Sequence, residues 1–222
     1  MQKQEIEITK QEAQFYGEHL PWLTAAIAAV QETIHTWRRL RLEEAGEDPL
    51  LYTTARIKSA DSMRAKLLRL GKRPTAANAL TTVHDAAGVR AICLFGEEVY
   101  RLAEALSEVQ GMRIVQAKDY IAQPKPSGYR SYHLIAEQLV SRPEGRRAVT
   151  VEIQLRTVAM DTWAALEHEI QYKQDVPERE FYQAELKRCA DEIASTELSL
   201  QTIRELIAER RNGHDADIIS RR

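Results

Sequence analysis

Residues 89–95 read Val-Arg-Ala-Ile-Cys-Leu-Phe, and six of these seven side chains are apolar. Such a short apolar run predicts a buried strand over residues 90–95, with Cys93 in the core. Later segments alternate between apolar and polar residues and predict strands over residues 113–121, 132–140 and 149–155. Helical spacing predicts helices over residues 97–110 and 157–172. The expected fold class is α/β (α+β), a mixed β-sheet flanked by helices.

Long helices are expected at both ends of the chain. Over the first 46 residues apolar side chains recur at helical spacing, and Pro21 suits the first turn of a helix. A breaker cluster at residues 45–49 ends this segment. A short helix is expected next, over residues 61–70. The tail is expected to form one helix over about residues 178–211.

The tail carries an apolar stripe that repeats every seven residues and forms a narrow heptad seam. The stripe consists of Leu186, Ile193, Leu200 and Ile207, with Cys189, Thr196 and Ile203 three residues after the first three. Two interpretations fit this seam. The helix packs on its own domain, or it contacts another subunit.

Size and composition exclude several classes of protein. The 222 residues have a net charge of −2, which excludes a chain-wide basic coat for nucleic acid. Two cysteines exclude a disulfide framework and a four-cysteine zinc site. The polar N-terminus is unlike a signal peptide, and no apolar run approaches the ~20 residues of a membrane span. We therefore expect a cytoplasmic, single-domain protein without a membrane partner. Its core would span about residues 50–175, between a helical segment over residues 1–46 and the tail helix.

Positive charge is concentrated between residues 56 and 73, where seven basic residues meet one acid, Asp61. Local positive charge in an acidic chain favours a polyanionic ligand, and a solvated helix face is the alternative. A second basic group interleaves with aromatic residues. That suits a nucleotide whose base stacks while its phosphates pair with cations, although strand tyrosines are often packing residues. The group comprises Lys118, Tyr120, Lys125, Tyr129, Arg130 and Tyr132.

Two carboxylates occupy informative positions. Asp85 shortly precedes the apolar run, and Glu152 lies inside the sequence Val-Glu-Ile-Gln-Leu at residues 151–155. A charge in so apolar a strand is costly unless it is paired or bound to a metal. Two carboxylates from neighbouring strands suit Mg²⁺, which favours few carboxylates together with phosphate oxygens and water. The alternative is an ion pair with a nearby arginine, such as Arg90 or Arg156.

Four ordered segments resemble the synthetase domain of the RelA/SpoT family in its stand-alone form, the small alarmone synthetases. The resemblance extends over about residues 56–173, and the flanking helices are similar as well. The first two segments are Arg56-Ile57-Lys58 and residues 85–90 (DAAGVR). The third joins residues 118–121 (KDYI) to 124–133 (PKPSGYRSYH), and the fourth joins residues 151–157 (VEIQLRT) to 160–168 (MDTWAALEH).

The resemblance implies a nucleotidyltransferase-like fold and a GTP diphosphokinase that moves pyrophosphate from ATP to the 3′-hydroxyl of GDP or GTP, giving (p)ppGpp and AMP. It implies that Asp85 and Glu152 hold the cofactor Mg²⁺ and that Glu152 takes the hydroxyl proton. For ATP it implies Arg56 and Arg90 on adenine, and Lys58, Lys66 and Arg69 on the phosphates. For the acceptor it implies Tyr129 stacked on guanine, Lys125 and His133 at the phosphates, and Gln154 and Glu167 lining the site. His133 and Glu167 are alternatively structural residues.

The chain departs from the family at Ser127, where Asn is frequent, and at Tyr132, where Leu is common. Serine can make similar turn hydrogen bonds, so a small effect on the acceptor loop is expected. His84-Asp85 spells the dipeptide of the family's hydrolase domain. Hydrolase activity is not expected, because 222 residues cannot house both domains.

Two other functions remain as alternatives. The same chemistry can act on another acceptor, such as a tRNA 3′ end or an adenine nucleotide. A catalytically silent nucleotide- or RNA-binding regulator is the second alternative, against which the carboxylate pair argues.

The resemblance also implies a homotetramer assembled through terminal helices, with a central cleft that binds (p)ppGpp in some members. Tyr52 and Thr54 match the region that lines this cleft, which makes them candidates for a regulatory site for (p)ppGpp or RNA. Tyr52 is alternatively a packing residue.

Overall fold

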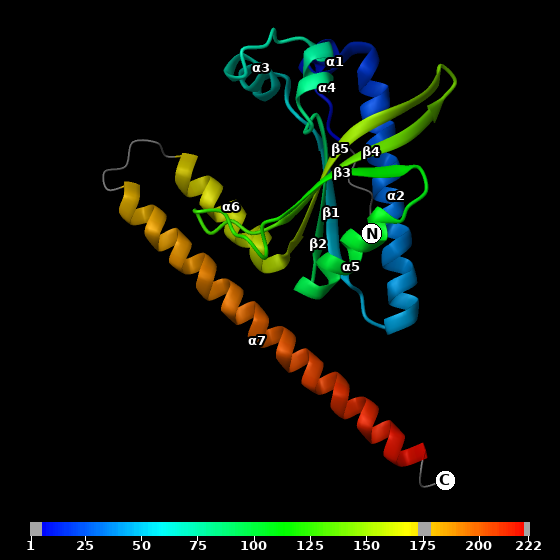
Figure 1. Ribbon diagram of the computed structural model, residues 1–222, viewed down its shortest axis with the longest axis vertical. Helices are drawn as coiled ribbons and strands as arrows, with labels where there is room; N and C mark the ends of the chain where they lie inside the picture. The colour runs from blue at the N-terminus through cyan, green and yellow to red at the C-terminus, as the bar shows by residue number, and fades with distance from the viewer. Residues whose placement is uncertain (1–5, 173–178, 220–222) are drawn as a thin grey trace.

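A five-stranded sheet in the order β1-β2-β5-β4-β3 forms the centre of the computed structural model, which describes residues 6–172 and 179–219 (Figure 1). Strands β2 and β5 run parallel, and the other three neighbouring pairs are antiparallel, so the expected mixed sheet is confirmed. The strands are β1 (Leu50–Ile57), β2 (Ala87–Cys93), β3 (Met112–Asp119), β4 (Tyr132–Arg142) and β5 (Gly145–Thr157).

Helices flank both faces of this sheet. Helices α2 (Leu20–Ala45) and α5 (Gly96–Ser107) cover one face, while α6 (Val158–Tyr172) and α7 (Arg179–Ile219) lie on the other side (Figure 1). Helix α1 (Lys10–Tyr16) and a 3₁₀ turn, η1 (Gly17–His19), lead into α2. Helices α3 (Ala60–Arg69) and α4 (Ala76–Thr82) stand between β1 and β2 in the chain.

The main core lies between the sheet and α2 with α5. Ile27, Val30 and Ile34 follow helical spacing along α2 and are fully buried, as their pattern predicts. Cys93 is buried at the end of β2, so its predicted role in the core is confirmed. Pro21 occupies the first turn of α2, and Gly46 ends the helix with a φ of 72°, a left-handed conformation that suits glycine.

The structure contains two elements that the sequence pattern did not indicate, β1 and α4. It also ends β2 at Cys93, two residues earlier than expected, because Phe95 serves as the N-terminal cap of α5. The break in the N-terminal helical segment lies at Gly17–His19 and precedes Pro21.

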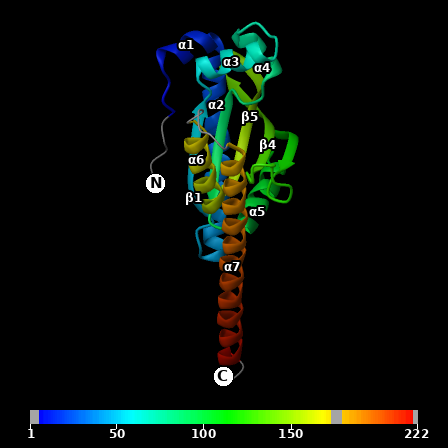
Figure 2. The ribbon, with the colours of Figure 1, turned by 90° about the vertical axis from the view of Figure 1, so that its left-hand side faces the viewer.

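The heptad seam along α7 has two parts with different surroundings. Leu186, Cys189 and Ile193 pack against a small cluster that contains Trp163, Ala164 and Ala190. Further along, Leu200, Ile203 and Ile207 are each more than half exposed. The first part therefore packs on its own chain, while the apolar side chains of the second part are exposed. Beyond this part the helix continues past the body of the molecule (Figure 2).

One arginine fixes this distal part of α7. Arg204 donates to Glu97 at 2.6 Å and to Glu47 at 3.0 Å, and its guanidinium lies 4.5 Å from the Phe95 ring centroid. Within the described residues, no helix is both long and apolar enough to span a membrane.

Candidate active site

The site is organised by β5, which lies between β4, the strand directly before it in the chain, and β2, which comes from a much earlier part of the chain. Gln154 is paired with Arg90 of β2 on one side and with His133 of β4 on the other. Paired residues face the same side of a sheet, so these three side chains form a row. The row lies on the face opposite the core, because Ile153 and Leu155 are buried against the helices on the other face.

A cavity of about 230 Å³ opens on this face beside β1, β2 and β5. Four residues predicted for the site, Arg56, Arg90, Glu152 and Gln154, line it together. Thr54, predicted as regulatory, lines the same cavity.

Asp85 supplies a negative charge at one end of the site, next to two lysines. Its Oδ2 accepts hydrogen bonds from Lys58 at 2.9 Å and from Lys66 at 2.8 Å. Burial acts to raise the pKa of Asp85, but the hydrogen bonds and charges of the two lysines outweigh it and hold the pKa below its usual value. Its Oδ1 is buried and has no hydrogen-bond partner among the described residues. An ionised carboxylate thus keeps one oxygen unused.

Asp85 and Glu152 fit a magnesium site. Asp85 directly precedes Ala86 and β2, and Glu152 is paired with Gly88 near the start of that strand. No group of three or more His, Cys, Asp and Glu able to hold a metal occurs in the part of the chain that the structure describes. A metal here would depend on two carboxylates supplemented by phosphate oxygens and water, the ligand set that Mg²⁺ favours. The unused Oδ1 of Asp85 supports this assignment.

Arg56 lies beside Gly88 of β2. The two residues are paired between β1 and β2, and a Cβ on Gly88 would meet the Arg56 side chain at 3.7 Å. Both residues line the cavity, so the Arg56 side chain borders open space. A flat guanidinium over open space is suited to stacking on a purine.

Glu152 is held by amide and imidazole groups. Its Oε2 accepts a hydrogen bond from Gln154 Nε2 at 2.9 Å, and its Oε1 lies 3.7 Å from His133 Nδ1. The predicted alternative, an ion pair with Arg90 or Arg156, is not formed, because both arginines pair with Asp161. Glu152 therefore faces the cavity without a cationic partner at hydrogen-bond distance among the described residues.

The loop between β3 and β4 carries the predicted acceptor residues. Lys125 Nζ lies 4.6 Å from the Tyr129 ring centroid and 4.8 Å from that of Tyr120. A turn closes the loop through hydrogen bonds from Gly128 to Lys125 and from Lys125 to Tyr129. The Tyr129 backbone donates to Ser127 Oγ at 3.4 Å, so serine makes the turn contact expected of it.

His133 is neutral in this environment. Burial, with the positive charges of Arg156, Lys125 and other cations, lowers its pKa to about 3. Arg156 donates to the Tyr129 hydroxyl at 2.6 Å, so that hydroxyl donates in turn to His133 Nε2 at 2.8 Å. A neutral imidazole that accepts at Nε2 carries its proton on Nδ1, which faces Glu152. His133 is therefore a neutral hydrogen-bond donor in this site, and not a cation.

Asp161 had no predicted role, and Arg156 was considered only as an alternative partner of Glu152, although both stand in the quoted motifs. Asp161 of α6 accepts hydrogen bonds from Arg90 and Arg156, and Arg156 joins Tyr129 to Gln154. Asp161 and Arg90 are 71 residues apart in the chain, so the sequence does not show their contact. No sequence signal indicates it, because an acidic residue in the first turn of a helix is common.

The remaining predicted residues lie further out. Arg69 is exposed in the last turn of α3, and Glu167 is partly buried on α6. Tyr52 is 36% exposed on β1, and its hydroxyl donates to Asp161 at 2.8 Å, so it is not simply a packing residue.

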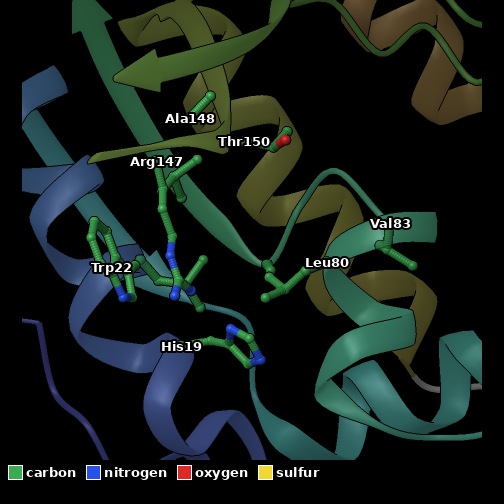
Figure 3. Close-up of a pocket in the computed structure, with 10 residues that line it drawn as sticks. His19, Trp22, Leu80, Val83, Arg147, Ala148 and Thr150 are labelled. Atoms are coloured by element: carbon green, nitrogen blue, oxygen red, sulfur yellow. The ribbon is translucent and has the colours of Figure 1, made fainter. Parts of the chain in front are cut away.

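A second cavity, of about 160 Å³, lies near the other end of β5, between α2 and α4 (Figure 3). Its walls are mostly apolar, and Arg147 lies beside Trp22 at 4.7 Å between guanidinium carbon and ring centroid. None of its lining residues is a carboxylate or a lysine. It therefore lacks the groups that phosphate transfer requires.

Comparisons with known proteins agree with this geometry. The model of the region found in RelA / SpoT proteins matches residues 55–176. GTP pyrophosphokinase YwaC of Bacillus subtilis is 45% identical over 148 residues, which cover 66% of this chain and 70% of the relative. The crystal structure of small alarmone synthetase 2 from B. subtilis superposes with a TM-score of 0.75 at 37% identity, covering 85% of this chain and 98% of that one. Small alarmone synthetase 1 from B. subtilis, bound to its product pppGpp, gives a TM-score of 0.77 at 30% identity, with 90% and 100% covered.

Proposed function

The chain belongs to the RelA/SpoT family as a small alarmone synthetase, and from this premise we propose how its site makes (p)ppGpp. The enzyme is a GTP pyrophosphokinase that moves pyrophosphate from ATP to the 3′-hydroxyl of GDP or GTP and releases AMP. One observation carries the assignment: Gln154 stands between Arg90 and His133, with Glu152 beside it. The residues proposed to bind ATP and those proposed to bind the acceptor nucleotide thus lie on the two sides of Glu152.

The donor nucleotide lies along β1, β2 and α3 in this proposal. Arg56 and Arg90 hold adenine, while Lys58, Lys66 and Arg69 contact the phosphates. Lys58 and Lys66 pair with Asp85, so an arriving triphosphate finds two cations already gathered. Mg²⁺ held by Asp85 and Glu152 would neutralise charge on the transferred group.

The acceptor nucleotide lies on the opposite side of β5. Its guanine stacks on Tyr129, its phosphates meet Lys125 and His133, and Gln154 and Glu167 line the site. Glu152 takes the proton of the 3′-hydroxyl, and the freed oxygen attacks the β-phosphorus of ATP. The bond from that phosphorus to the oxygen bridging the α- and β-phosphates breaks, and AMP leaves with the electron pair. Gln154 already donates to Oε2, while Oε1 lies 3.7 Å from His133 Nδ1, beyond hydrogen-bond distance, so Oε1 is the oxygen available for the proton.

The direct test supplies the enzyme with γ-labelled ATP and, in separate reactions, GDP, GTP, ATP and tRNA. We expect label in ppGpp and pppGpp, with AMP formed in equal amount. Label that enters only tRNA or adenine nucleotides would contradict the proposed acceptor. The absence of any AMP would contradict pyrophosphate transfer itself.

Replacement of Tyr129 by alanine should weaken guanine-nucleotide binding by about 1–3 kcal/mol, the range for a base stacked on an aromatic ring. Binding of an ATP analogue should change much less, and calorimetric titration with each nucleotide measures both. Tyr129→Phe is the matched control, because it keeps the ring and loses only the hydroxyl contacts with Arg156 and His133. An equal loss for both nucleotides in the alanine variant would indicate a collapsed loop.

We also propose a homotetramer that assembles through the terminal helices. The apolar residues exposed on the distal part of α7 support this proposal, because they lie on a helix that extends beyond the body. The paired substitution Leu200→Glu and Ile207→Glu should dissociate the assembly, as measured by light scattering. Neither residue touches the site. A wild-type mass near the 25.4 kDa of one chain would contradict the proposal.

In such an assembly Tyr52 and Thr54 are the proposed contacts for a regulator, either (p)ppGpp or RNA. The exposure of Tyr52 on β1 supports its part in this role. We expect the enzyme in the cytoplasm, where its nucleotide substrates are found. The enzyme that carries both Leu200→Glu and Ile207→Glu should lose any activation by added (p)ppGpp, because it no longer forms the assembly.

A further inference from the structure

Asp161 stands at the meeting point of several polar side chains that belong to both sides of the site. It lies in the first turn of α6, where the helix dipole favours a negative charge. Its side chain is 14% exposed. Oδ1 accepts hydrogen bonds from Arg90 at 3.0 Å and from Arg156 at 2.8 Å, while Oδ2 accepts one from Tyr52 at 2.8 Å. Both oxygens of this carboxylate are therefore engaged by other side chains.

The two arginines need this carboxylate to remain side by side. Burial and the positive charge of Arg156 lower the pKa of Arg90, and the negative charge of Asp161 acts in the opposite direction. The Nε atoms of Arg90 and Arg156 are buried and lack a hydrogen-bond partner within the described residues. With Asp161 neutral, two neighbouring guanidinium groups would repel each other in a partly buried place.

Arg156 extends the contact to the acceptor side and to the catalytic carboxylate. Its Nη2 donates to the Tyr129 hydroxyl at 2.6 Å and to Gln154 Oε1 at 3.1 Å. The Gln154 amide then donates from Nε2 to Glu152 at 2.9 Å. Asp161 is thus one hydrogen bond away from Arg90 on the ATP side and two hydrogen bonds away from Tyr129 on the acceptor side.

We propose that Asp161 is a positioning residue that couples the two nucleotide subsites, so that binding of one nucleotide favours binding of the other. A nucleotide that fixes Arg90 also fixes Asp161, and through Arg156 it fixes the Tyr129 ring before the second nucleotide arrives. The second nucleotide then loses less conformational freedom on binding. This inference rests on the proposed function, because it takes Arg90 and Tyr129 as contacts of the two substrates.

The test measures binding, so that it is independent of turnover. The affinity of a non-hydrolysable ATP analogue is determined by calorimetry without GDP and with saturating GDP, and the ratio is the coupling factor. In the wild type we expect a factor of roughly 5 or more, the lower end of ordinary coupling between sites. In Asp161→Asn, which keeps the shape and removes the charge, the factor should fall to about 1.

Two further variants separate coupling from general damage. Glu169→Gln changes an exposed carboxylate on the same helix and should keep the wild-type factor. Arg156→Lys keeps the charge but removes the fork that contacts Asp161, Tyr129 and Gln154 together, so it should also abolish coupling. It provides the second measurement if Asp161→Asn does not fold.

The outcomes are distinct from those for the proposed function. A merely structural role for Asp161 would weaken both nucleotides and leave the coupling factor unchanged, which would overturn the inference. A wild-type factor of 1 would overturn it as well. In either case labelled ATP would still yield (p)ppGpp. If the wild type bound both nucleotides with coupling and yet made no (p)ppGpp, the proposed function would fail and the coupling would stand.

Discussion

Glu152→Gln should lower the turnover of (p)ppGpp synthesis by at least about 100-fold, the usual scale for loss of a general base. The substitution keeps the shape of the side chain and its place opposite Gly88, but an amide cannot accept the proton of the 3′-hydroxyl. It also removes one of the two charges proposed to hold Mg²⁺. Turnover is measured as AMP release at saturating ATP and GDP.

A matched control for this variant lies on the neighbouring strand. Glu137 of β4 pairs with Arg113 across the sheet edge and lies outside the cavity. Glu137→Gln should therefore retain the activity of the wild type. If Glu152→Gln turned over as fast as this control, the assignment of Glu152 as the base would be wrong.

Asp85→Asn should lower turnover by about 10²–10³-fold, the scale for loss of one preorganised electrostatic group in a site. Two effects act together. The neutral amide no longer offsets Lys58 and Lys66, and Oδ1 no longer offers a charged ligand. The concentration of Mg²⁺ needed for half-maximal activity should rise, and a titration of activity against Mg²⁺ measures it.

Asp61→Asn is the control for this second variant, because Asp61 is exposed and pairs with Arg64 on the same helix, α3. It should leave both turnover and the Mg²⁺ requirement unchanged. An Asp85→Asn enzyme that lost activity without any change in its Mg²⁺ requirement would contradict the metal site and leave only the contact with the lysines.

The strands that carry the site were largely predictable, with β1 as the exception. Strands β2, β4 and β5 are buried at regular positions, so their sequences show the expected apolar pattern. Strand β1 lies at the edge of the sheet and has a register shift between Leu50 and Tyr52, so its burial does not alternate. Two of its side chains, Thr54 and Arg56, line the cavity instead of the core.

The site residues also divide into those that the sequence pattern indicates and those that only the fold brings into the site. Asp85 and Glu152 could be singled out because a carboxylate next to an apolar strand is unusual. Asp161 could not, because an acidic residue in the first turn of a helix is common on any surface. Only the fold brings it to Arg90, which is 71 residues away in the chain. The tail helix was ambiguous for a similar reason, since one seam serves both its own domain and an exposed face.

The parallel pairing of β2 with β5 has a consequence for the order of folding. The antiparallel pairs β3–β4 and β4–β5 join segments that follow each other in the chain, and they can form through local contacts. Pairing Gly88 with Glu152 closes a much longer loop, which is entropically the slower event. The donor and acceptor halves of the site meet only at this junction. We therefore expect a refolding chain to regain catalysis in a late, non-local step, after its local helices and the β4–β5 hairpin have formed.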